Sequence, residues 1–383
     1  MDEIRAFLDK RSAEGLLRGL RPITSRGNGK ITMGGSEYID FSSNDYLGLS
    51  GHPKLINAAK AAIDEFGIGS SASRLLSGSF DIHHRLEEEV ARFKNKEAAL
   101  VFNSGYQANI GILSALYGEG DAIFSDKLNH ASIIDGMFLS AAKVFRFLHN
   151  DPDSLETLLK RHRNRFKRAL IITETIFSMD GDRAPIERLV ELKEKYDCRI
   201  MVDEAHATGI FGINGAGVVE EEGLSDRVDL IMGTFSKALG SFGAYLASSK
   251  DVIDYLINTC RSFIYSTSLP PAVIAGNLAS LEVVKEEPHR RRSLISKAKF
   301  FRDRLVAMGF EVRGSSQIVP VIAGENDRAM RFAKAVQEKG YWVLPIRPPT
   351  VPQKEARLRF SITSYHTEEI LCALLKDIAH VKI

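Results

Sequence analysis

Two charged residues follow apolar runs of the chain, at positions from which they could do chemistry. Asp203 comes directly after the run Ile200–Val202, and Lys237 follows the run Leu230–Gly233 after a short polar turn. Open α/β sheets bind ligands at the carboxyl ends of their strands. Taken singly, Asp203 is compatible with a turn cap and Lys237 with a solvated surface lysine. An aspartate and a lysine at the ends of two nearby strands form a much less usual pair.

This pair of residue types is what a pyridoxal phosphate site requires. A lysine forms an imine with the cofactor's aldehyde, and a carboxylate facing the ring nitrogen keeps it protonated, so that the ring accepts electrons. The cofactor's phosphate needs hydroxyl groups and the N–H donors of a helix N-terminus. Asn103–Gln107 suits this role, because it follows the apolar run Ala98–Phe102 and opens an apolar helix. Thr234 and Ser236 flank the lysine and offer hydroxyl donors.

The cofactor ring also needs an aromatic side chain to stack on it. His130, in the segment Asp126–Ser132, follows the apolar run Ala122–Ser125 and is the best candidate. From the sequence alone, a half-buried loop histidine without this function is an equally good interpretation.

Apolar runs that alternate with amphipathic segments predict the fold that positions these residues. Such spacing favours an α/β fold with a mostly parallel sheet covered by helices on both faces. Residues 1–20 carry leucines at helical spacing, and after about residue 285 helices mix with short strands, which predicts a smaller α+β domain. We therefore expect an N-terminal helix and arm over 1–45, a large domain over 46–285 and a small domain over 286–383. The expected elements are strands at Ala98–Phe102, Ala122–Ser125, Ala169–Thr173, Arg199–Val202, Leu230–Gly233, Gly243–Ala247, Val319–Ile322 and Leu358–Ile362, and helices at Pro185–Lys195, Pro288–Met308, Ala329–Lys339 and Thr367–His380.

Composition excludes several classes of protein. The 383 residues carry a net charge of +2, too near neutral for nucleic acid or an anionic membrane as the main partner. Cys198, Cys260 and Cys372 lie far apart, which argues against a disulfide framework or a zinc knuckle and fits a reducing compartment. The charged start of the chain lacks the apolar core of a signal peptide, and no apolar stretch reaches the length of a membrane span. We therefore expect a cytoplasmic protein.

Two further patterns have alternative interpretations. Asp203–His206 spells the DEAH string of helicases, but the chain lacks the phosphate loop that a helicase needs. His83 and His84, with Glu87 and Glu88, suggest metal ligands. We expect instead a solvated helix face and no metal, because no third and fourth ligand is apparent.

Several short segments occur together in one order along the chain. They are Asn44–Gly48, Gly69–Gly78, Ser104–Asn109, Asn129–Ser132, Phe177–Asp182, Val202–His206 and Thr234–Lys237. With these segments, from about residue 15 to its end, the chain resembles the α-oxoamine synthases, a family of fold-type-I pyridoxal phosphate enzymes. The resemblance implies a fold-type-I transferase with a large cofactor-binding domain, working as a homodimer with shared active sites.

The resemblance also implies a role for individual residues at the cofactor. Lys237 would hold the cofactor as a Schiff base, Asp203 would pair with the ring nitrogen, and His206 would hydrogen-bond the ring's 3′-oxygen. The remaining cofactor contacts it implies are stacking by His130, positioning by Ser178 and Thr234, phosphate binding by Ser104, Gly105 and Tyr106, and phosphate binding by Ser266 and Thr267 of the other subunit.

For the substrates, the resemblance implies a decarboxylating condensation of an amino acid with an acyl thioester. Arg359 would hold the amino-acid carboxylate, and Asn44, Thr350 and Arg18 would contact substrate, with Arg21 as an alternative to Arg18.

Two segments narrow the choice of substrates within the family. Ile264–Ser268, and Ile346–Pro352 followed by Ala356–Arg359, look most like the member of biotin synthesis that joins L-alanine to a pimeloyl thioester. The thioester is carried by CoA or by a carrier protein. Glycine with acetyl-CoA, and serine with a fatty acyl-CoA, remain alternatives. A catalytically silent partner subunit is the alternative from another class, and the intact Lys237, Asp203 and His206 argue against it.

Overall fold

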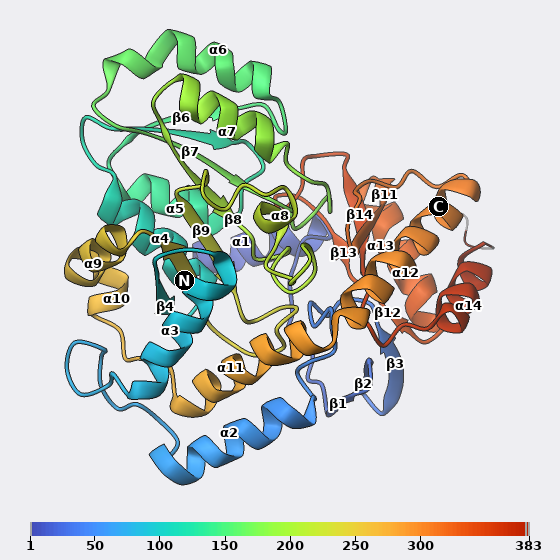
Figure 1. The fold of residues 1–383 in the computed structure, drawn as a ribbon. Coiled ribbons are helices and arrows are strands. Elements are labelled where there is room, and N and C mark those ends of the chain that lie inside the picture. The colour runs from blue at the N-terminus through green and yellow to red at the C-terminus, as the bar shows by residue number, and fades with distance from the viewer. Residues whose placement is uncertain (1, 380, 382–383) are drawn as a thin grey trace. The chain divides into compact units, whose positions relative to one another are not determined.

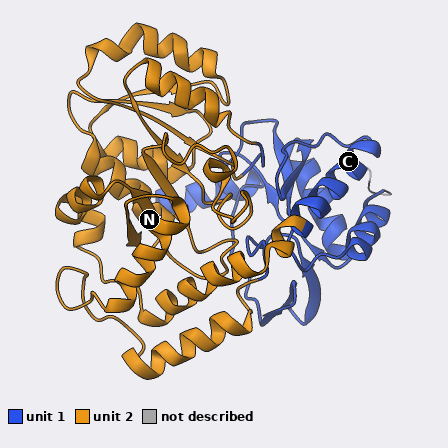
Figure 2. Cartoon of the chain, in the orientation of Figure 1, with its two compact units in different colours: residues 1–48, 179–182, 293–383 blue, residues 49–178, 183–292 orange. Residues whose placement is uncertain are grey.

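The computed structural model describes residues 2–379 and 381, and the chain divides into two compact units (Figure 2). Unit 2 comprises residues 49–178 and 183–292; unit 1 comprises the chain up to residue 48, residues 179–182 and the chain from residue 293 onward. The first and last parts of the chain therefore belong to the same unit. The sequence analysis placed boundaries nearby, after residues 45 and 285, and treated the first segment as a separate arm.

A seven-stranded sheet forms the centre of unit 2 (Figure 1). Its strands are β4 (Ala98–Phe102), β5 (Ala122–Asp126), β6 (Lys143–Phe147), β7 (Ala169–Glu174), β8 (Arg199–Asp203), β9 (Leu230–Thr234) and β10 (Ala244–Ser248). They lie in the order β4–β10–β9–β8–β7–β5–β6. Only β10 runs antiparallel to its neighbours, β4 and β9, and the other pairs are parallel. All strands except β10 therefore end at the same edge of the sheet, and the predicted, mostly parallel α/β fold is confirmed.

Both faces of this sheet are covered, which is why its strands are continuous apolar runs. Alternate side chains such as Leu170 and Ile172 pack with α4 (Gly105–Leu116) and α5 (Ala131–Leu139) into one buried cluster. On the other face, α6 (Pro152–His162) and α7 (Ile186–Lys195) lie side by side (Figure 1). Each fully buried aliphatic side chain contributes about 1.5–3 kcal/mol, so this core holds the strand ends in fixed register.

The other helices of unit 2 surround this core. They are α2 (Pro53–Phe66), α3 (Asp81–Lys94), the 3₁₀ helix η1 (Arg163–Arg165), α8 (Val218–Glu221), α9 (Lys250–Thr259), α10 (Arg261–Ile264) and α11 (Pro271–Glu286). The boundary between the units at residue 292 lies within α12 (Pro288–Ala307).

The expectation that His83 lies on a solvated face of α3 is wrong. Its ring is buried and Nε2 lies 3.0 Å from the carbonyl oxygen of Leu269, whereas His84 is exposed. Glu87 forms two hydrogen bonds with Arg74. The pair of histidines thus splits between the core and solvent, because neighbouring residues on a helix point in different directions.

Unit 1 contains two small sheets and three helices of its own besides most of α12, counted over its described residues. The sheets are ordered β1–β2–β3–β12 and β11–β14–β13. The elements are α1 (Asp2–Ala13), β1 (Ser25–Gly27), β2 (Lys30–Met33), β3 (Ser36–Asp40), β11 (Ile318–Gly324), α13 (Asn326–Glu338), β12 (Tyr341–Trp342), β13 (Pro345–Ile346), β14 (Ala356–Ser361) and α14 (Glu368–Ile378).

Two predicted helices of unit 1 differ in length from those observed. The helix predicted over residues 1–20 ends at Ala13, because Gly15 takes a left-handed backbone conformation (φ +64°) that stops it. The helix predicted over Thr367–His380 begins after Thr367, which caps it, and ends at Ile378; His380 lies outside the described residues.

Within the described part of the chain, no helix has both the length and the hydropathy to cross a membrane.

Candidate active site

The shared edge of the large sheet carries the chemistry-bearing residues of unit 2. Asp203 ends β8, Thr234 ends β9, and Lys237 follows in the turn after β9. The Nζ atom of Lys237 lies 2.8 Å from Nε2 of His206, which follows β8. The structure thus brings together the lysine and the histidine that the sequence analysis selected. Ser178, predicted to position the cofactor, is half-buried in the segment after β7.

The turn that presents Lys237 is tightly fixed. The Thr234 hydroxyl donates to the carbonyl oxygen of Gly243 (2.8 Å) and accepts from the backbone N–H of Ser236 (3.1 Å). Beyond the lysine, Gly240 has φ +66°, and a Cβ atom there would lie 2.4 Å from the backbone nitrogen of Ser50, so only glycine fits. Thr234 therefore orders the lysine turn, while Ser236 exposes its side chain.

Asp203 is buried with both carboxylate oxygens hydrogen-bonded. Oδ1 accepts from the backbone N–H of Ala205 (2.9 Å) and Oδ2 accepts from Nδ2 of Asn109 (3.0 Å). The two contacts hold this buried carboxyl group in one orientation at the sheet edge. A carboxyl group at this place is the partner that a protonated ring nitrogen requires.

His130 caps the N-terminus of α5 with its own side chain. Its Nδ1 lies 3.2 Å from the backbone nitrogen of Ser132 and 2.8 Å from the Ser132 hydroxyl. His130 is exposed, but protein on one side of its ring partly desolvates it and lowers its pKa; the charge of Asp203 opposes this effect and Lys237 adds to it. His130 is therefore predominantly neutral at pH 7.

Glu174 is a member of this cluster that the sequence analysis missed. It ends β7, is paired in register with Asp203 on β8, and is only 3 % exposed. Burial, and after it the charge of Asp203, raise the pKa of Glu174 to about 8, although Lys237 and a backbone hydrogen bond from His130 oppose the rise. A conspicuous acidic residue at the end of the predicted strand Ala169–Thr173 was the only sequence signal.

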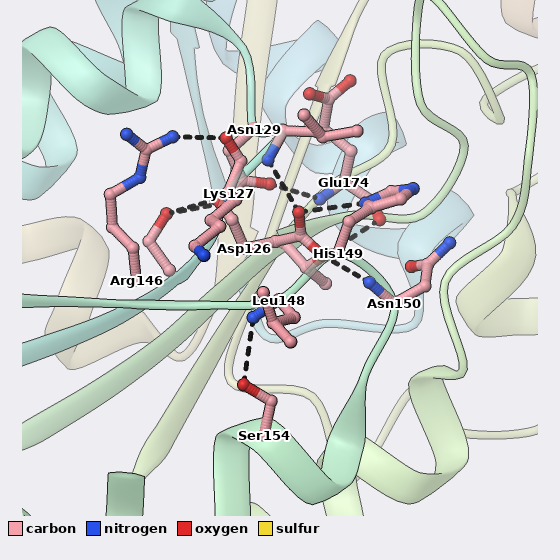
Figure 3. A network of polar contacts seen from close by, with 12 residues as sticks. Asp126, Lys127, Asn129, Arg146, Leu148, His149, Asn150, Ser154 and Glu174 are labelled. Atoms are coloured by element: carbon pink, nitrogen blue, oxygen red, sulfur yellow. Dashed lines mark hydrogen bonds and ion pairs between the residues drawn. The ribbon is translucent and has the colours of Figure 1, made fainter. Parts of the chain in front are cut away.

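A polar network around Asp126 and Asn129 joins the ends of three strands (Figure 3). Asp126, at the end of β5, accepts from His149 Nδ1 (3.0 Å) and from the backbone N–H of Asn150 (2.9 Å), both after β6. Asn129 Oδ1 accepts from the backbone N–H of Glu174 (3.1 Å) at the end of β7. His130, the next residue, is thereby held at a fixed place at the sheet edge.

The raised pKa of Glu174 predicts a pH-dependent stability difference. A carboxyl group with an ordinary pKa near 4.5 when unfolded and about 8 when folded makes the folded state progressively less stable as pH rises from about 4.5 to about 8. Glu174→Gln removes this effect, so we expect the variant to gain stability over the parent by a few kcal/mol across that interval and to keep a constant difference above it. Urea unfolding of the cofactor-free protein between pH 5 and 9 measures this.

The matched control is Glu119→Gln, since Glu119 is an exposed residue of the same unit. Its stability difference from the parent should not vary with pH. A flat difference for Glu174→Gln as well would mean that Glu174 titrates normally.

The loop after β4 forms a helix N-terminus suited to an anion. Ser104 accepts from the Gln107 N–H (3.2 Å), and Gln107 Oε1 accepts from the Asn103 N–H (2.9 Å), so side chains cap the start of α4 from both sides. The first-turn N–H groups, at Gly105 and Tyr106, have no partner within the helix and attract negative charge.

Ser266 and Thr267 lie beside this helix start in the same chain. Gln107 Nε2 donates to the Ser266 hydroxyl (2.8 Å), and Asn103 Nδ2 donates to the Thr267 carbonyl (2.8 Å). Their predicted reach into the site of a second subunit stays a prediction.

The groups of unit 2 fit pyridoxal phosphate. An amine (Lys237), a hydrogen-bonded carboxylate (Asp203), an imidazole (His130) and a capped helix N-terminus lie along one sheet edge, at the ends of β9, β8, β5 and β4. This donor set meets the needs of the aldehyde, the ring nitrogen, the ring face and the phosphate, respectively.

Unit 1 holds the predicted carboxylate-binding arginine within a buried polar cluster. Arg359, on β14, donates to Asn44 Oδ1 (3.3 Å) and to the Tyr46 hydroxyl (3.1 Å), and Tyr46 in turn donates to Asn44 (3.0 Å). Two of the predicted substrate contacts, Arg359 and Asn44, are thus neighbours. Tyr46 was not selected from the sequence, although it lies within the segment Asn44–Gly48.

The other two predicted substrate contacts, Arg18 and Thr350, also lie together in unit 1. Arg18 donates to the Thr350 hydroxyl (3.0 Å), and both line a cavity of about 220 Å³ with Arg347. Arg21 instead places its guanidinium 5.3 Å from the centre of the Trp342 ring. Of the two arginines left open by the sequence, Arg18 is the one that shares a cavity with Thr350.

Comparisons with known proteins agree with this geometry. The family model described as aminotransferase class I and II matches residues 36–378. The 8-amino-7-oxononanoate synthase of Geotalea daltonii is 48 % identical over 98 % of this chain and 96 % of the relative, and that of Geobacter sulfurreducens is 49 % identical over 96 % and 95 %.

Among solved structures, a serine palmitoyltransferase from S. paucimobilis has a TM-score of 0.93 at 32 % identity and covers 99 % of this chain and 96 % of that one. The 8-amino-7-oxononanoate synthase of Francisella tularensis has a TM-score of 0.77 at 31 % identity and covers 89 % and 97 %.

Proposed function

The chain belongs to the aminotransferase class I and II family, among its α-oxoamine synthases, and from this premise we propose that it makes 8-amino-7-oxononanoate for biotin synthesis. In the proposed reaction L-alanine condenses with a pimeloyl thioester, and CO2 and the free thiol are released. The observation that carries the proposal is near-full-length identity of about 48 % to enzymes of that name. The cluster of Lys237, His206 and Asp203 supports it, since a catalytically silent relative would not need to keep these groups.

When bound, pyridoxal phosphate supplies an aldehyde that joins an amine and a ring that takes up the electrons released at the amino acid's Cα. Lys237 would hold the cofactor, and its amine would accept the Cα proton once free. His206 supports this role. Once the amine of Lys237 has taken up the proton, the resulting ammonium would donate to Nε2 of His206 across 2.8 Å and would be held in place. Asp203 would keep the ring nitrogen protonated, and the N–H groups of Gly105 and Tyr106 would bind the phosphate.

The substrate contacts follow from side-chain chemistry. Arg359 offers a planar pair of N–H donors, the geometry that binds a carboxylate most strongly, and would hold the carboxylate of L-alanine. Asn44 orients the guanidinium of Arg359, which donates to Asn44 Oδ1 across 3.3 Å. Arg18 and Thr350 would contact the acyl substrate. His130 would polarise the carbonyl oxygen of the thioester as the new carbon–carbon bond forms.

The assembly and place of action belong to the same proposal. We propose a homodimer with shared sites, to which Ser266 and Thr267 contribute across the interface. Cys198, Cys260 and Cys372 are free thiols, which supports action in the reducing cytoplasm.

Within the family, the condensation of serine with a long-chain acyl thioester is the second candidate, because serine palmitoyltransferases have the same fold at 32 % identity. This reaction ranks second because the chain is 48 % identical to an 8-amino-7-oxononanoate synthase but only 32 % identical to the serine palmitoyltransferase.

Competition between acyl donors tests the proposed substrate. With L-alanine in excess and pimeloyl-CoA, acetyl-CoA and palmitoyl-CoA at equal concentrations, we expect 8-amino-7-oxononanoate almost exclusively. Each CH2 group that the acyl pocket buries contributes about 0.8 kcal/mol, so the longer pimeloyl chain should exceed acetyl by roughly 10²-fold. A pocket that fits pimeloyl is too short to bury the additional CH2 groups of palmitoyl, so these groups should give no advantage. Between alanine and glycine we expect less discrimination, because one methyl group is worth about 1–3 kcal/mol. Product mass spectrometry reads out the result, and a dominant acetyl or palmitoyl product would assign a different member of the family.

A further inference from the structure

A chain of hydrogen bonds connects Asp203 to His130 through two buried side chains with no assigned role. Asn109 Nδ2 lies 3.0 Å from Asp203 Oδ2 and 2.9 Å from Ser132 Oγ. Ser132 Oγ lies 2.8 Å from His130 Nδ1. Asn109 is 1 % exposed and Ser132 is 0 % exposed. The four residues come from β8, α4 and the start of α5, so the tertiary structure creates this connection.

Chemistry fixes the direction of each hydrogen bond. An amide nitrogen only donates, and its two hydrogens serve Asp203 and Ser132. The opposite orientation of the Asn109 amide would place its oxygen 3.0 Å from a carboxylate oxygen, which is repulsive. The Ser132 oxygen accepts from Asn109, so its own hydrogen is available for His130 Nδ1.

A second donor reaches the same ring nitrogen. The backbone N–H of Ser132 lies 3.2 Å from His130 Nδ1 and can only donate. The backbone contact requires a lone pair on Nδ1, so the hydrogen of the neutral ring is on Nε2 and the Ser132 hydroxyl donates to Nδ1. The lowered pKa of His130, caused first by desolvation, agrees with a neutral ring.

We propose that Asn109 and Ser132 are positioning residues that hold His130 in the Nε2–H tautomer, so that its ring presents a hydrogen-bond donor to the acyl carbonyl oxygen. A fixed donor stabilises the negative charge that develops on such an oxygen during carbon–carbon bond formation. Asn109 also donates to Asp203, so one connection serves both the carboxylate and the donor. The identity of the acceptor rests on the proposed function; the tautomer does not.

Nitrogen NMR of the full-length protein, labelled with ¹⁵N-histidine and studied with and without cofactor, tests the tautomer. His130→Gln assigns the His130 signals. We expect the Nε2–H tautomer in the parent protein. Asn109→Ala, and more strongly the double variant Asn109→Ala/Ser132→Ala, should populate the Nδ1–H form in part, because the backbone N–H of residue 132 still donates to Nδ1. We expect kcat to fall about tenfold with the KM for L-alanine unchanged.

Two further variants separate positioning from a structural role. Ser132→Thr keeps the hydroxyl and should retain the Nε2–H tautomer and most of kcat. Ser140→Ala is the matched control, because Ser140 is a buried serine at the other end of α5 whose hydroxyl donates to Met137 (2.7 Å). It should lower thermal stability without changing the tautomer.

The outcomes are distinct. An Nδ1–H or doubly protonated ring in the parent at pH 7, or an unchanged tautomer in the double variant, would overturn the inference. A confirmed Nε2–H ring in a protein that rejects pimeloyl-CoA would overturn the proposed substrate and leave the positioning role standing.

Discussion

Replacing Lys237 with alanine is expected to abolish turnover and the covalent attachment of pyridoxal phosphate. Its Nζ atom is the amine beside His206 at the sheet edge. In the proposed function this amine would be both the anchor of the cofactor and the base for the Cα proton. Loss of a positioned base alone costs about 10²–10⁴-fold in rate, and loss of the anchor adds to it. The variant should keep its fold, since Lys237 lies on a turn that Thr234 and Gly240 fix independently.

Borohydride reduction followed by peptide mass spectrometry checks the assignment. In the parent, which should be yellow with cofactor, the label should be on Lys237, and Lys237→Ala should carry none. Lys127→Ala is a control of the same unit, because Lys127 is exposed and follows Asp126 at the end of β5. A label on any other lysine of the parent would refute the site.

Replacing Asp203 with asparagine is expected to leave cofactor binding largely intact and to lower kcat by about 10²-fold or more. An amide cannot keep the ring nitrogen protonated, and the ring then takes up electrons poorly. The structure adds a second cause. Asn109 donates to Oδ2 of Asp203, so an NH2 group at that place would face another NH2 group and disturb the connection to Ser132 and His130.

Absorbance and single-turnover kinetics separate these effects. We expect a changed pH dependence of the cofactor's visible band together with slow proton abstraction from deuterated L-alanine. Asp229→Asn is a control, because Asp229 also accepts a backbone N–H, from Ile200 (2.8 Å), but at the opposite end of β8. Near-parental turnover of Asp203→Asn would contradict the role of this carboxylate.

Glu174 and Asp203 are two buried carboxyl groups that lie side by side at the edge of the sheet. The two carboxyl groups end neighbouring strands in register, and two buried charges of one sign at that spacing are unfavourable. Asp203 accepts two hydrogen bonds, and burial keeps Glu174 protonated near neutral pH. In the proposed function Asp203 would face the cofactor, with Glu174 as its neutral neighbour.

The sequence by itself determined the large sheet and the residues at the ends of its strands. Runs such as Ile200–Val202 and Leu230–Gly233 are strands because both sheet faces are buried, and this makes them continuous apolar stretches that are easily recognised. Asp203 and Lys237 were identifiable because a polar residue after such a run lies at the sheet edge. The partly exposed edge strand β6 mixes charged and apolar residues, so it is not a continuous apolar run, and it was missed.

Only the tertiary structure decided which side chains meet. Asn109 is one polar residue in an apolar helix, and Ser132 is one serine after a loop; their contacts with Asp203 and His130 depend on how α4 and α5 pack on the sheet. Glu174 is unusual only because β7 lies beside β8 and buries it next to Asp203. Local patterns fix secondary structure through nearest neighbours, whereas burial, pKa and tautomer depend on residues far apart in the chain, and their positions follow from packing.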